Sequence, residues 1–388
     1  MVRRILVWLT SSLLVLSLIA MGVGGWYYSD QLLPAPPPFE PELTVEVVGS
    51  DEDTGSITFA TAAGDLVALD TVGMVSANGT LILEGPTDAL SDGSARTGVL
   101  IDGGWPEPGT LVGPAVDTFY GDPATTLELP FEDVDVPSSH GVLPAWRVVP
   151  NGSDTDTWVV IVHGRGGTLS EGNRLLPVLG ELGLPSLTIS VRNDPNAPAD
   201  PDGYGYYGDQ EWEDLQAAIE HLVITEGAER IVLAGYSQGG SIALGFLRRS
   251  SDADLIEAAV LISPLVSLNE TLVLQAQMRD IPDPVIPPLL FATRLITSLR
   301  SDLDFDQVDH LGRLDELPTD VPMLMTHGSA DETVPVGPTR ELAAARPGQI
   351  TYEEYPGTGH VREWNTDRER FDEDLRDFLN EHALTPAG

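Results

Sequence analysis

The sequence predicts an α/β fold in which a mostly parallel sheet carries helices on both faces. From about residue 131 onward, short apolar runs alternate with helical stretches. The apolar runs are nearly continuous, which is typical of parallel strands that are buried on both faces. One helical stretch places Trp212, Leu215, Ile219 and Leu222 at intervals of three and four residues, which indicates a single buried helix face. An N-terminal transmembrane helix and a small β-rich module are expected to precede this fold.

Composition limits the possible partners of the chain. Its 388 residues include 60 acidic and 20 basic ones, for a net charge of -40, and every basic residue is Arg. Such a surface repels phosphate backbones, so we expect no nucleic-acid partner. Genome composition and adaptation to high salt are both open as reasons for the charge. The chain has no Cys, which excludes disulfides, a thiolate nucleophile and Cys-type zinc sites.

Residues 1–30 predict a membrane anchor. The stretch from Ile5 to Ser29 has no charged residue, and a helix of that length spans a hydrocarbon core of about 30 Å. Arg3 and Arg4 would stay in the cytoplasm, so we expect a single-pass protein at the cell membrane with the remainder of the chain on the extracytoplasmic side. The alternative is a cleaved signal peptide and a secreted protein, although Ala20-Met21-Gly22 is a poor cleavage site.

Two further segments separate the anchor from the α/β region. Residues 31–42 are Pro-rich and predict a semi-rigid stalk. Residues 43–130 predict a small β-rich module, because short apolar runs lie between turn residues. Structural support and partner docking are both open as its role. The expected runs are Leu43–Val48, Ser56–Ala60, Leu66–Leu69, Thr80–Leu83 and Thr97–Ile101.

Residues 131–388 form the predicted α/β domain, which opens with a hairpin whose turn lies at Ser138–Gly141. An insertion at about residues 265–320 is too long for an ordinary connection, and we expect it to cap the C-terminal edge of the sheet. The expected strands are Trp158–Val162, Leu187–Val191, Arg230–Ala234, Ala258–Ser263, Pro322–Thr326 and Ile350–Tyr355, and the expected helices are Glu211–Ile224, Gln238–Arg249, Pro338–Arg346 and Asp367–His382.

Ser237 is the candidate nucleophile. It lies in Gly235-Tyr236-Ser237-Gln238-Gly239, directly after an expected strand and before an expected helix. The pattern alone arises by chance in many chains, but this setting predicts a sharp turn that holds the serine Oγ above the sheet edge. The helix N-terminus that follows favours a developing negative charge.

A serine hydroxyl needs a base, and the base needs a group that orients it. Of the seven histidines, His360 in "YPGTGHV" is the candidate base, because it follows the last strand on a Gly-rich loop. The candidate acid is Asp331, on the loop after the preceding strand, with Glu332 or Asp302 as alternatives. Because these loops leave the same edge of a parallel sheet, both side chains can approach Ser237.

The stretch "WVVIVHGRGGT" predicts an oxyanion site. A strand that ends in His-Gly-x-Gly-Gly exposes backbone N–H groups that no side chain crowds. The expected donors are the backbone amides of Arg165 and Gln238. The segment Asp202–Gly208 borders the acyl pocket or forms an ordinary surface turn.

The elements "HGRGGT", "GYSQG", "HGSADETVP" and "GTGHV" occur in the order found in α/β-hydrolases, and the chain resembles that superfamily over about residues 131–382. It is also similar to exported actinobacterial members. The resemblance implies an α/β-hydrolase fold, Ser237 as nucleophile, His360 as base, Asp331 as orienting acid, and the Arg165 and Gln238 amides as oxyanion donors. It implies a serine hydrolase of carboxylesterase type that acts on a small-molecule acyl substrate without metal or cofactor.

Other functions stay open at this point. A peptidase or acyl-peptidase-like hydrolase, transfer of the acyl group to another acceptor, and a catalytically silent cell-surface binding protein are the alternatives. The acyl specificity, the protein partners and the oligomeric state do not follow from the sequence.

Overall fold

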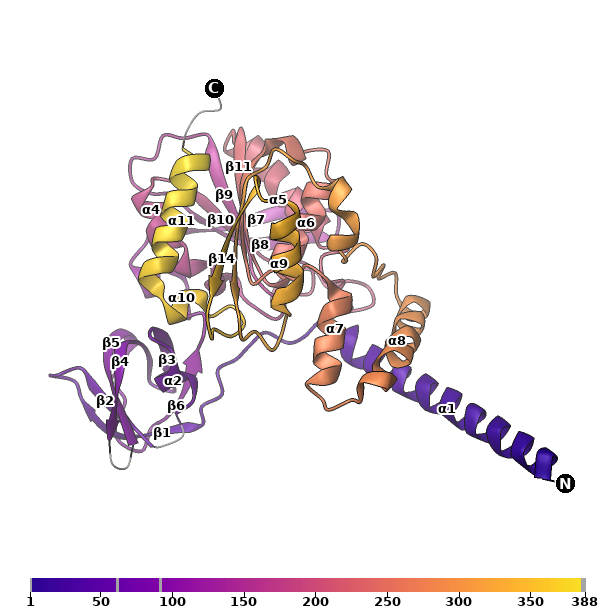
Figure 1. Ribbon diagram of the computed structural model, residues 1–388. Coiled ribbons are helices and arrows are strands. Elements are labelled where there is room, and N and C mark those ends of the chain that lie inside the picture. Colours follow the sequence, from indigo (N-terminus) through magenta and orange to yellow (C-terminus); the bar gives the residue numbers. More distant parts are fainter. Residues whose placement is uncertain (1, 61–62, 91–92, 385–388) are drawn as a thin grey trace.

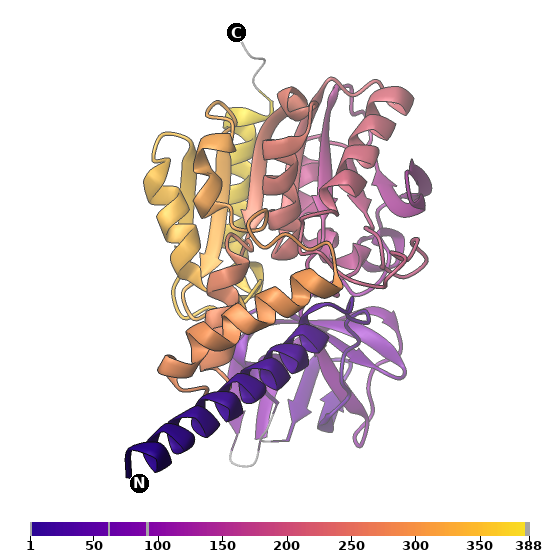
Figure 2. The same ribbon diagram turned by 90° about the vertical axis from the view of Figure 1, so that its right-hand side faces the viewer.

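The computed structural model describes residues 2–60, 63–90 and 93–384. Two β structures organise these ranges: an α/β domain built on an eight-stranded sheet, and a smaller barrel that lies beneath it in Figures 1 and 2. The α/β sheet has the strand order β14-β13-β12-β11-β9-β10-β8-β7. Strands β14 to β10 in this order run parallel, whereas β8 and β7 pair antiparallel. The predicted α/β class with a mostly parallel sheet is confirmed.

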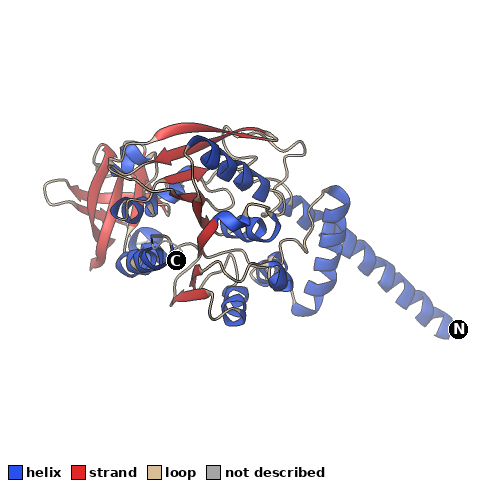
Figure 3. Cartoon of the chain, turned by 90° about the horizontal axis from the view of Figure 1, so that it is seen from above, coloured by secondary structure: helices blue, strands red, loops and turns tan. Residues whose placement is uncertain are grey.

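The central strands are buried along their whole length because helices cover both faces of the sheet. Every residue of β9 and β13 is buried. In Figure 3 the strands run between two groups of helices. Helices α5, α6 and α9 pack on one face of the sheet, and α4 and α11 pack on the other. The strands of this sheet are β7 (Glu132–Ser138), β8 (Gly141–Val148), β9 (Thr157–Val162), β10 (Ser186–Ile189), β11 (Arg230–Tyr236), β12 (Ile256–Ile262), β13 (Met323–Gly328) and β14 (Ile350–Tyr355).

The helices follow the predicted pattern closely. The expected helices over Glu211–Ile224, Gln238–Arg249, Pro338–Arg346 and Asp367–His382 occur as α5 (Trp212–Thr225), α6 (Gln238–Arg249), α9 (Val336–Ala345) and α11 (Arg368–His382). The expected hairpin is β7–β8, in which Ser138 pairs with Gly141. Further short helices, which no pattern had indicated, are η1 (Leu169–Arg174), α4 (Leu176–Glu181), η2 (Ala253–Leu255) and α10 (Glu363–Thr366).

The barrel is closed by the pairing of its first and last strands, β1 and β6. Its strands are β1 (Val45–Asp51), β2 (Ser56–Phe59), β3 (Val72–Ser76), β4 (Gly79–Leu90), β5 (Gly93–Gly103) and β6 (Leu111–Ala115). The run Leu66–Leu69, expected as a strand, is instead the short helix α2 (Asp65–Ala68), and Leu66 packs into the barrel core. A further helix, α3 (Pro123–Leu127), leads into the α/β domain.

The insertion between β12 and β13 contains α7 (Leu268–Gln277), η3 (Asp283–Val285), α8 (Ile286–Arg300) and η4 (Leu311–Glu316). Helix α1 (Val2–Leu32) lies alongside α8, as Figures 1 and 2 both show. Gly25 permits this approach, because a Cβ there would lie 2.8 Å from the backbone carbon of Ala292. Arg300 of α8 also hydrogen-bonds to Ser29 Oγ at 3.0 Å. The C-terminal turns of α1 are therefore packed against the insertion.

The predicted transmembrane helix at Ile5–Ser29 is not supported. The structure does form a helix there, but within residues 2–60, 63–90 and 93–384 no helix has both the length and the apolar character that crossing a membrane requires.

The Pro-rich segment after α1 lies along the α/β domain, whereas the sequence predicts a stalk. Pro34 forms a bridge with Tyr204, and Ala35 N–H donates to the Gly203 carbonyl. Farther along, Phe39 N–H donates to the carbonyl of Gly166 at 2.7 Å. We call Leu33–Phe39 the strap, because it joins α1 to the barrel by crossing the loop that follows β9.

Candidate active site

Ser237 occupies a strained turn between β11 and α6. Its backbone has φ 51° and ψ -109°, a left-handed conformation that a non-glycine residue rarely adopts. The turn is so tight that a Cβ on Gly235 would lie 2.5 Å from the backbone carbon of Gly239, and a Cβ on Gly239 would collide with the Val162 carbonyl. These two glycines allow the turn, which presents Ser237 at the carboxyl edge of the sheet.

The structure brings the predicted base to the predicted nucleophile. His360 lies on the loop after β14, and its Nε2 is 2.9 Å from Ser237 Oγ. Its Nδ1 is 2.6 Å from Asp331 Oδ2. Because a carboxylate only accepts, Nδ1 carries the proton and Nε2 is free to accept from the serine hydroxyl.

Asp331, on the loop after β13, is a fully hydrogen-bonded carboxylate. Its Oδ1 accepts from the backbone N–H groups of Thr333 and Val334, both at 2.8 Å. Its Oδ2 accepts from His360 and also from His327 Nε2 at 3.1 Å. Burial opposes ionisation, but hydrogen bonds from His327 and His360 hold the pKa of Asp331 well below its usual value.

The two alternative acids take no part in this arrangement. Glu332 and Asp302 are both exposed, whereas Asp331 is buried. Of these three carboxylates, Asp331 is the one that contacts His360.

The predicted oxyanion donors flank Ser237. Gly164 lies so close that a Cβ there would be 3.2 Å from Ser237 Cβ, which places the loop after β9 over the serine. The backbone N–H groups of Arg165 and Gln238 have no acceptor among the described residues. Gln238 is the first residue of α6, so its amide also lies at the positive end of the helix. Two unengaged amides beside Ser237 are suited to bind a developing oxyanion.

His163, the residue before this loop, is a buried cation. Its Nδ1 is 2.8 Å from the Gly164 carbonyl and its Nε2 is 2.7 Å from Asp194 Oδ2. Both partners are acceptors, so both ring nitrogens carry protons. Burial works against the charge, but Asp194 and the Gly164 carbonyl raise the pKa of His163 to about 9. Because the Gly164 carbonyl and the Arg165 N–H belong to one peptide unit, His163 fixes the direction of that N–H.

A buried polar network connects the loop after β9 with the loop that carries His360. The network consists of Glu171, Arg174 and Asn365. Glu171 accepts from Gly164 N–H at 2.7 Å and from Arg174 at 3.3 Å. Arg174, which is 1% exposed, also donates to the carbonyl of Val361 at 3.0 Å and to Asn365 Oδ1 at 3.3 Å. The same guanidinium stacks over the ring of Tyr236, next to Ser237, at 4.8 Å. The Arg174 side chain therefore links the loop after β9, the turn of Ser237 and the loop that carries His360.

The barrel contacts the histidine loop from the same side. Asn365 Nδ2 donates to the carbonyls of Thr71 and Val116, at 3.0 and 3.1 Å. Arg362 donates to the His360 carbonyl at 3.1 Å and pairs with Asp65 of α2 at 2.6 Å. The loop that carries His360 is therefore held by the barrel as well as by its own sheet.

A further carboxyl of this region is Asp117, which connects the barrel to η1. It accepts from Ser170 Oγ at 3.0 Å. Burial and the nearby charge of Glu171 raise the pKa of Asp117 to about 6. In the described ranges no group of three or more acidic or histidine side chains could hold a metal ion.

Sequence reasoning missed the supporting residues. The available signal was that His163 directly follows β9 and His327 lies near the end of β13, each just before a glycine. Glu171 and Arg174 lie in a short helix without a periodic pattern, so nothing in the sequence marked them. Asp194 could not be distinguished from the other acidic residues.

Comparison with known proteins agrees with this architecture. A sequence model of the alpha/beta hydrolase family matches residues 159–373. An uncharacterized protein of Mycobacterium tuberculosis is 27% identical over 270 residues, which cover 64% of this chain and 84% of that protein. The esterase Pf2001 of Pyrococcus furiosus is 21% identical with a TM-score of 0.53, covering 68% of this chain and 95% of its own. A second crystal form of that esterase has a TM-score of 0.51 at 21% identity, covering 68% and 96%.

The solved structures share the fold of the α/β domain with this chain. The family match begins inside β9 and extends into α11, so it includes the loops that carry Arg165, Ser237, Asp331 and His360. Because this match covers more than half of its length, the chain belongs to the alpha/beta hydrolase family.

Proposed function

We propose that this protein is a serine hydrolase that cleaves ester-type acyl bonds by way of an acyl-enzyme. The observation that carries the proposal is the continuous hydrogen-bonded series Ser237 Oγ, His360 Nε2, His360 Nδ1 and Asp331 Oδ2, with separations of 2.9 and 2.6 Å. Such a series provides a nucleophile, a base and an orienting acid in contact with one another.

The proposed reaction starts with attack of Ser237 Oγ on the substrate carbonyl while His360 Nε2 takes the serine proton. The oxyanion that forms is bound by the N–H groups of Arg165 and Gln238. His360 then gives its proton to the leaving alkoxide, and the acyl group stays on Ser237. A water molecule attacks the acyl-enzyme carbonyl and loses a proton to His360. The bond between Ser237 Oγ and the acyl group then breaks, Ser237 Oγ takes that proton from His360, and the acid is released. Throughout, Asp331 stabilises the imidazolium and holds its tautomer.

Two further observations support the proposal. The negative charge of Asp331 is retained by four donors, so it can balance the imidazolium. The fold neighbour from Pyrococcus furiosus is named an esterase, which makes ester cleavage the first activity to test. Peptidase activity, acyl transfer and silent binding have no observation of their own in their favour.

The test compares Ser237→Ala with Ser251→Ala, an exposed serine just beyond α6. We expect wild type and Ser251→Ala to hydrolyse p-nitrophenyl acetate and to be labelled by a fluorophosphonate probe, and Ser237→Ala to do neither. Full turnover by Ser237→Ala would refute the proposal. Parallel assays with p-nitroanilides distinguish an esterase from a peptidase.

The location of the protein stays a prediction. Export was predicted from residues 1–30, and neither the contacts of α1 nor the relatives bear on it.

A further inference from the structure

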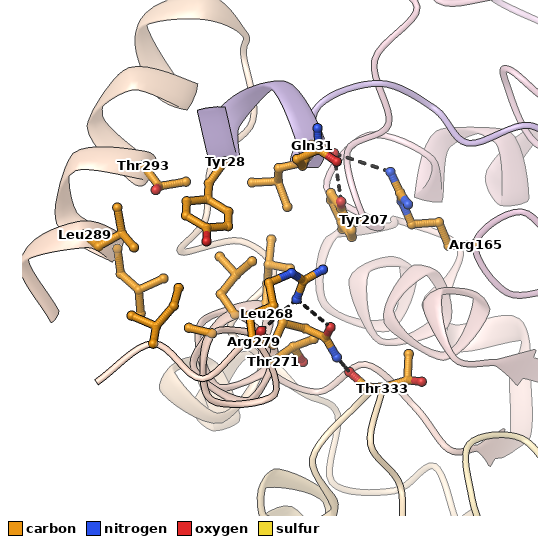
Figure 4. A pocket seen from close by; sticks show the side chains of 16 residues that line it. Tyr28, Gln31, Arg165, Tyr207, Leu268, Thr271, Arg279, Leu289, Thr293 and Thr333 are labelled. Carbon is orange, nitrogen blue, oxygen red and sulfur yellow. Dashed lines mark hydrogen bonds between the residues drawn. The ribbon is translucent and has the colours of Figure 1, made fainter. Parts of the chain in front are cut away.

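A cavity of about 250 Å³ lies between the N-terminal helix and the insertion. Its walls come mainly from α7 and α8 of the insertion and from α1, which is distant from both in sequence. Figure 4 shows Tyr28 pointing from α1 into this space, with Leu289 and Thr293 of α8 on one side and Leu268 and Thr271 of α7 on the other. Helix α1 is thus part of the cavity wall.

The cavity borders the loops of the active site. Arg165, whose amide is a proposed oxyanion donor, lines it, and so does Thr333, whose N–H donates to Asp331. Tyr207, in the segment for which the sequence left an acyl pocket or a surface turn open, lines it too. Leu265, which precedes the lining residue Leu268 by three positions, donates its N–H to the carbonyl of Ser237 at 2.9 Å. The cavity therefore borders the loops after β9 and β13, which carry Arg165 and Asp331.

The charged groups in the wall already have partners. Arg165 donates to the Pro34 carbonyl at 2.7 Å and stacks over Tyr207 at 5.0 Å. Arg279 donates to the carbonyl and side-chain oxygens of Gln275, at 2.7 and 3.0 Å. Gln275 in turn donates to the Glu332 carbonyl at 2.9 Å. The wall that remains for contact with a ligand is therefore mainly apolar. Its apolar residues include Leu32, Leu268, Leu272, Ala276, Leu289 and Leu290.

Among the described residues, one buried polar group of the wall lacks a hydrogen-bond partner. Thr293 is 2% exposed, and among the described residues its Oγ1 has no hydrogen-bond partner. A buried hydroxyl without a partner is unfavourable. A cavity with mostly apolar walls and a few polar groups is the usual form of a small-molecule site.

We propose that α1 forms part of the substrate site, and that the cavity which it partly lines receives the apolar acyl chain of the ester. This inference rests on the proposed serine hydrolase function and names its substrate class. An apolar cavity of about 150 Å³ holds one benzene molecule, so a cavity of about 250 Å³ accommodates a chain of about six to ten carbon atoms. The substrates are then medium-chain acyl esters.

The position of α1 is fixed by contacts on both sides of Tyr28. On one side, Gly25 packs closely on Ala292, and Trp26 stacks with Arg300 at 4.4 Å. On the other, the Leu32 carbonyl accepts from Tyr207 Oη at 2.8 Å, and the strap continues over Gly166. Held in this way, the Tyr28 ring can set the depth of the cavity.

The experiment measures kcat/KM for p-nitrophenyl esters from two to fourteen carbons on the full chain. We expect a wild-type maximum between about six and ten carbons, since each buried methylene favours binding about fourfold. Tyr28→Ala removes a ring from the cavity wall and should move the maximum at least about two carbons higher. Val23→Ala is the control, because Val23 is exposed on the same helix and lies outside the lining, so it should leave the maximum unchanged.

A second variant fills the cavity from the other side. Ala276 is a buried lining residue of α7, and Ala276→Phe should lower kcat/KM for the eight-carbon ester about 15-fold relative to the two-carbon ester. The inference is overturned if Tyr28→Ala and Ala276→Phe keep the wild-type chain-length profile, or if Val23→Ala shifts it as much as Tyr28→Ala does. Fluorophosphonate labelling of Ser237 in the same samples separates the two proposals, because it tests the hydrolase function whatever the profile.

Discussion

The two sides of the active site are built from different interactions. On the side of the barrel, Glu171, Arg174 and Asn365 form a buried network in which charged groups are paired. On the side of the insertion, α1, α7 and α8 line a cavity with mostly apolar walls, in which Arg165 and Arg279 already have partners. The first side positions Ser237, His360 and the oxyanion loop. The second contacts the substrate chain in our proposal.

This contrast predicts how each side responds to mutation. Removal of one partner from a buried charged pair leaves an unpaired charge, which typically costs about 3–5 kcal/mol. Removal or addition of a few apolar atoms changes binding in small steps of about 0.8 kcal/mol per methylene. We therefore expect the polar side to tolerate few changes and the apolar side to vary gradually in specificity.

The largest effect is expected at Asp331. Asp331→Asn replaces the acceptor of His360 with a group that favours the wrong imidazole tautomer, and kcat should fall about 10⁴-fold. The measurement is steady-state hydrolysis of p-nitrophenyl acetate.

Glu332→Gln is the matched control, because Glu332 is the exposed neighbour of Asp331. A comparable fall for Glu332→Gln would contradict the assignment of the acid.

A smaller effect is expected from the His163 cation. The pKa of His163 is raised to about 9 from 6.5, so its contribution to stability is complete below about pH 6.5 and is lost as the pH rises through 9. This rise in the pKa of His163 corresponds to roughly 3 kcal/mol of folding stability. Urea unfolding between pH 6 and 10 should show this loss in wild type and not in His163→Gln.

His140→Gln serves as the control, since His140 is exposed and 3.9 Å from Glu213. An unchanged pH dependence in His163→Gln would show that His163 is neutral in the folded protein.

The smallest effect is expected where α1 meets α8. A Cβ at Gly25 would lie 2.9 Å from the Ala292 Cβ, so Gly25→Ala must separate the helices, which typically costs about 1 kcal/mol or more. We expect KM for the eight-carbon ester to rise about fivefold and hydrolysis of the acetate to stay unchanged.

Gly22→Ala is the paired control, because nothing lies within 4 Å of a Cβ at that position on the same helix. Equal effects of the two substitutions would point to helix propensity and would contradict the role of the α1–α8 contact.

Much of the α/β domain could be predicted because its signals are local. Each expected strand of the sheet from Trp158 to Tyr355 has a counterpart within a few residues, since nearly continuous apolar runs have few alternatives to a buried parallel strand. The juxtaposition of Ser237, Asp331 and His360 also followed from position, because all three lie on loops at the carboxyl edge of one sheet. Their catalytic roles stay predictions until the variants are measured.

The rest depends on contacts between distant parts of the chain. Leu66–Leu69 has the composition of a short strand, but it forms α2 because Leu66 fills the core of a barrel whose closure depends on the pairing of β1 with β6. Nothing local indicates that Asn365 reaches Thr71, or that Tyr28 borders a cavity with α7 and α8. The predicted anchor also depends on a contact between distant parts of the chain, because the apolar residues near the C-terminal end of α1 pack on α8 of the insertion.

The packing of the barrel against the loop that carries His360 has a consequence for biosynthesis. Asp65 and Arg362 are 297 residues apart, and Ser29 and Arg300 are 271 apart. Translation proceeds from the N-terminus at about 5–20 residues per second, so the barrel and α1 leave the ribosome at least about ten seconds before their docking partners exist. During that interval the apolar face of α1 and the underside of the barrel are without their final contacts, and we expect this nascent chain to depend on chaperones more than the completed protein does.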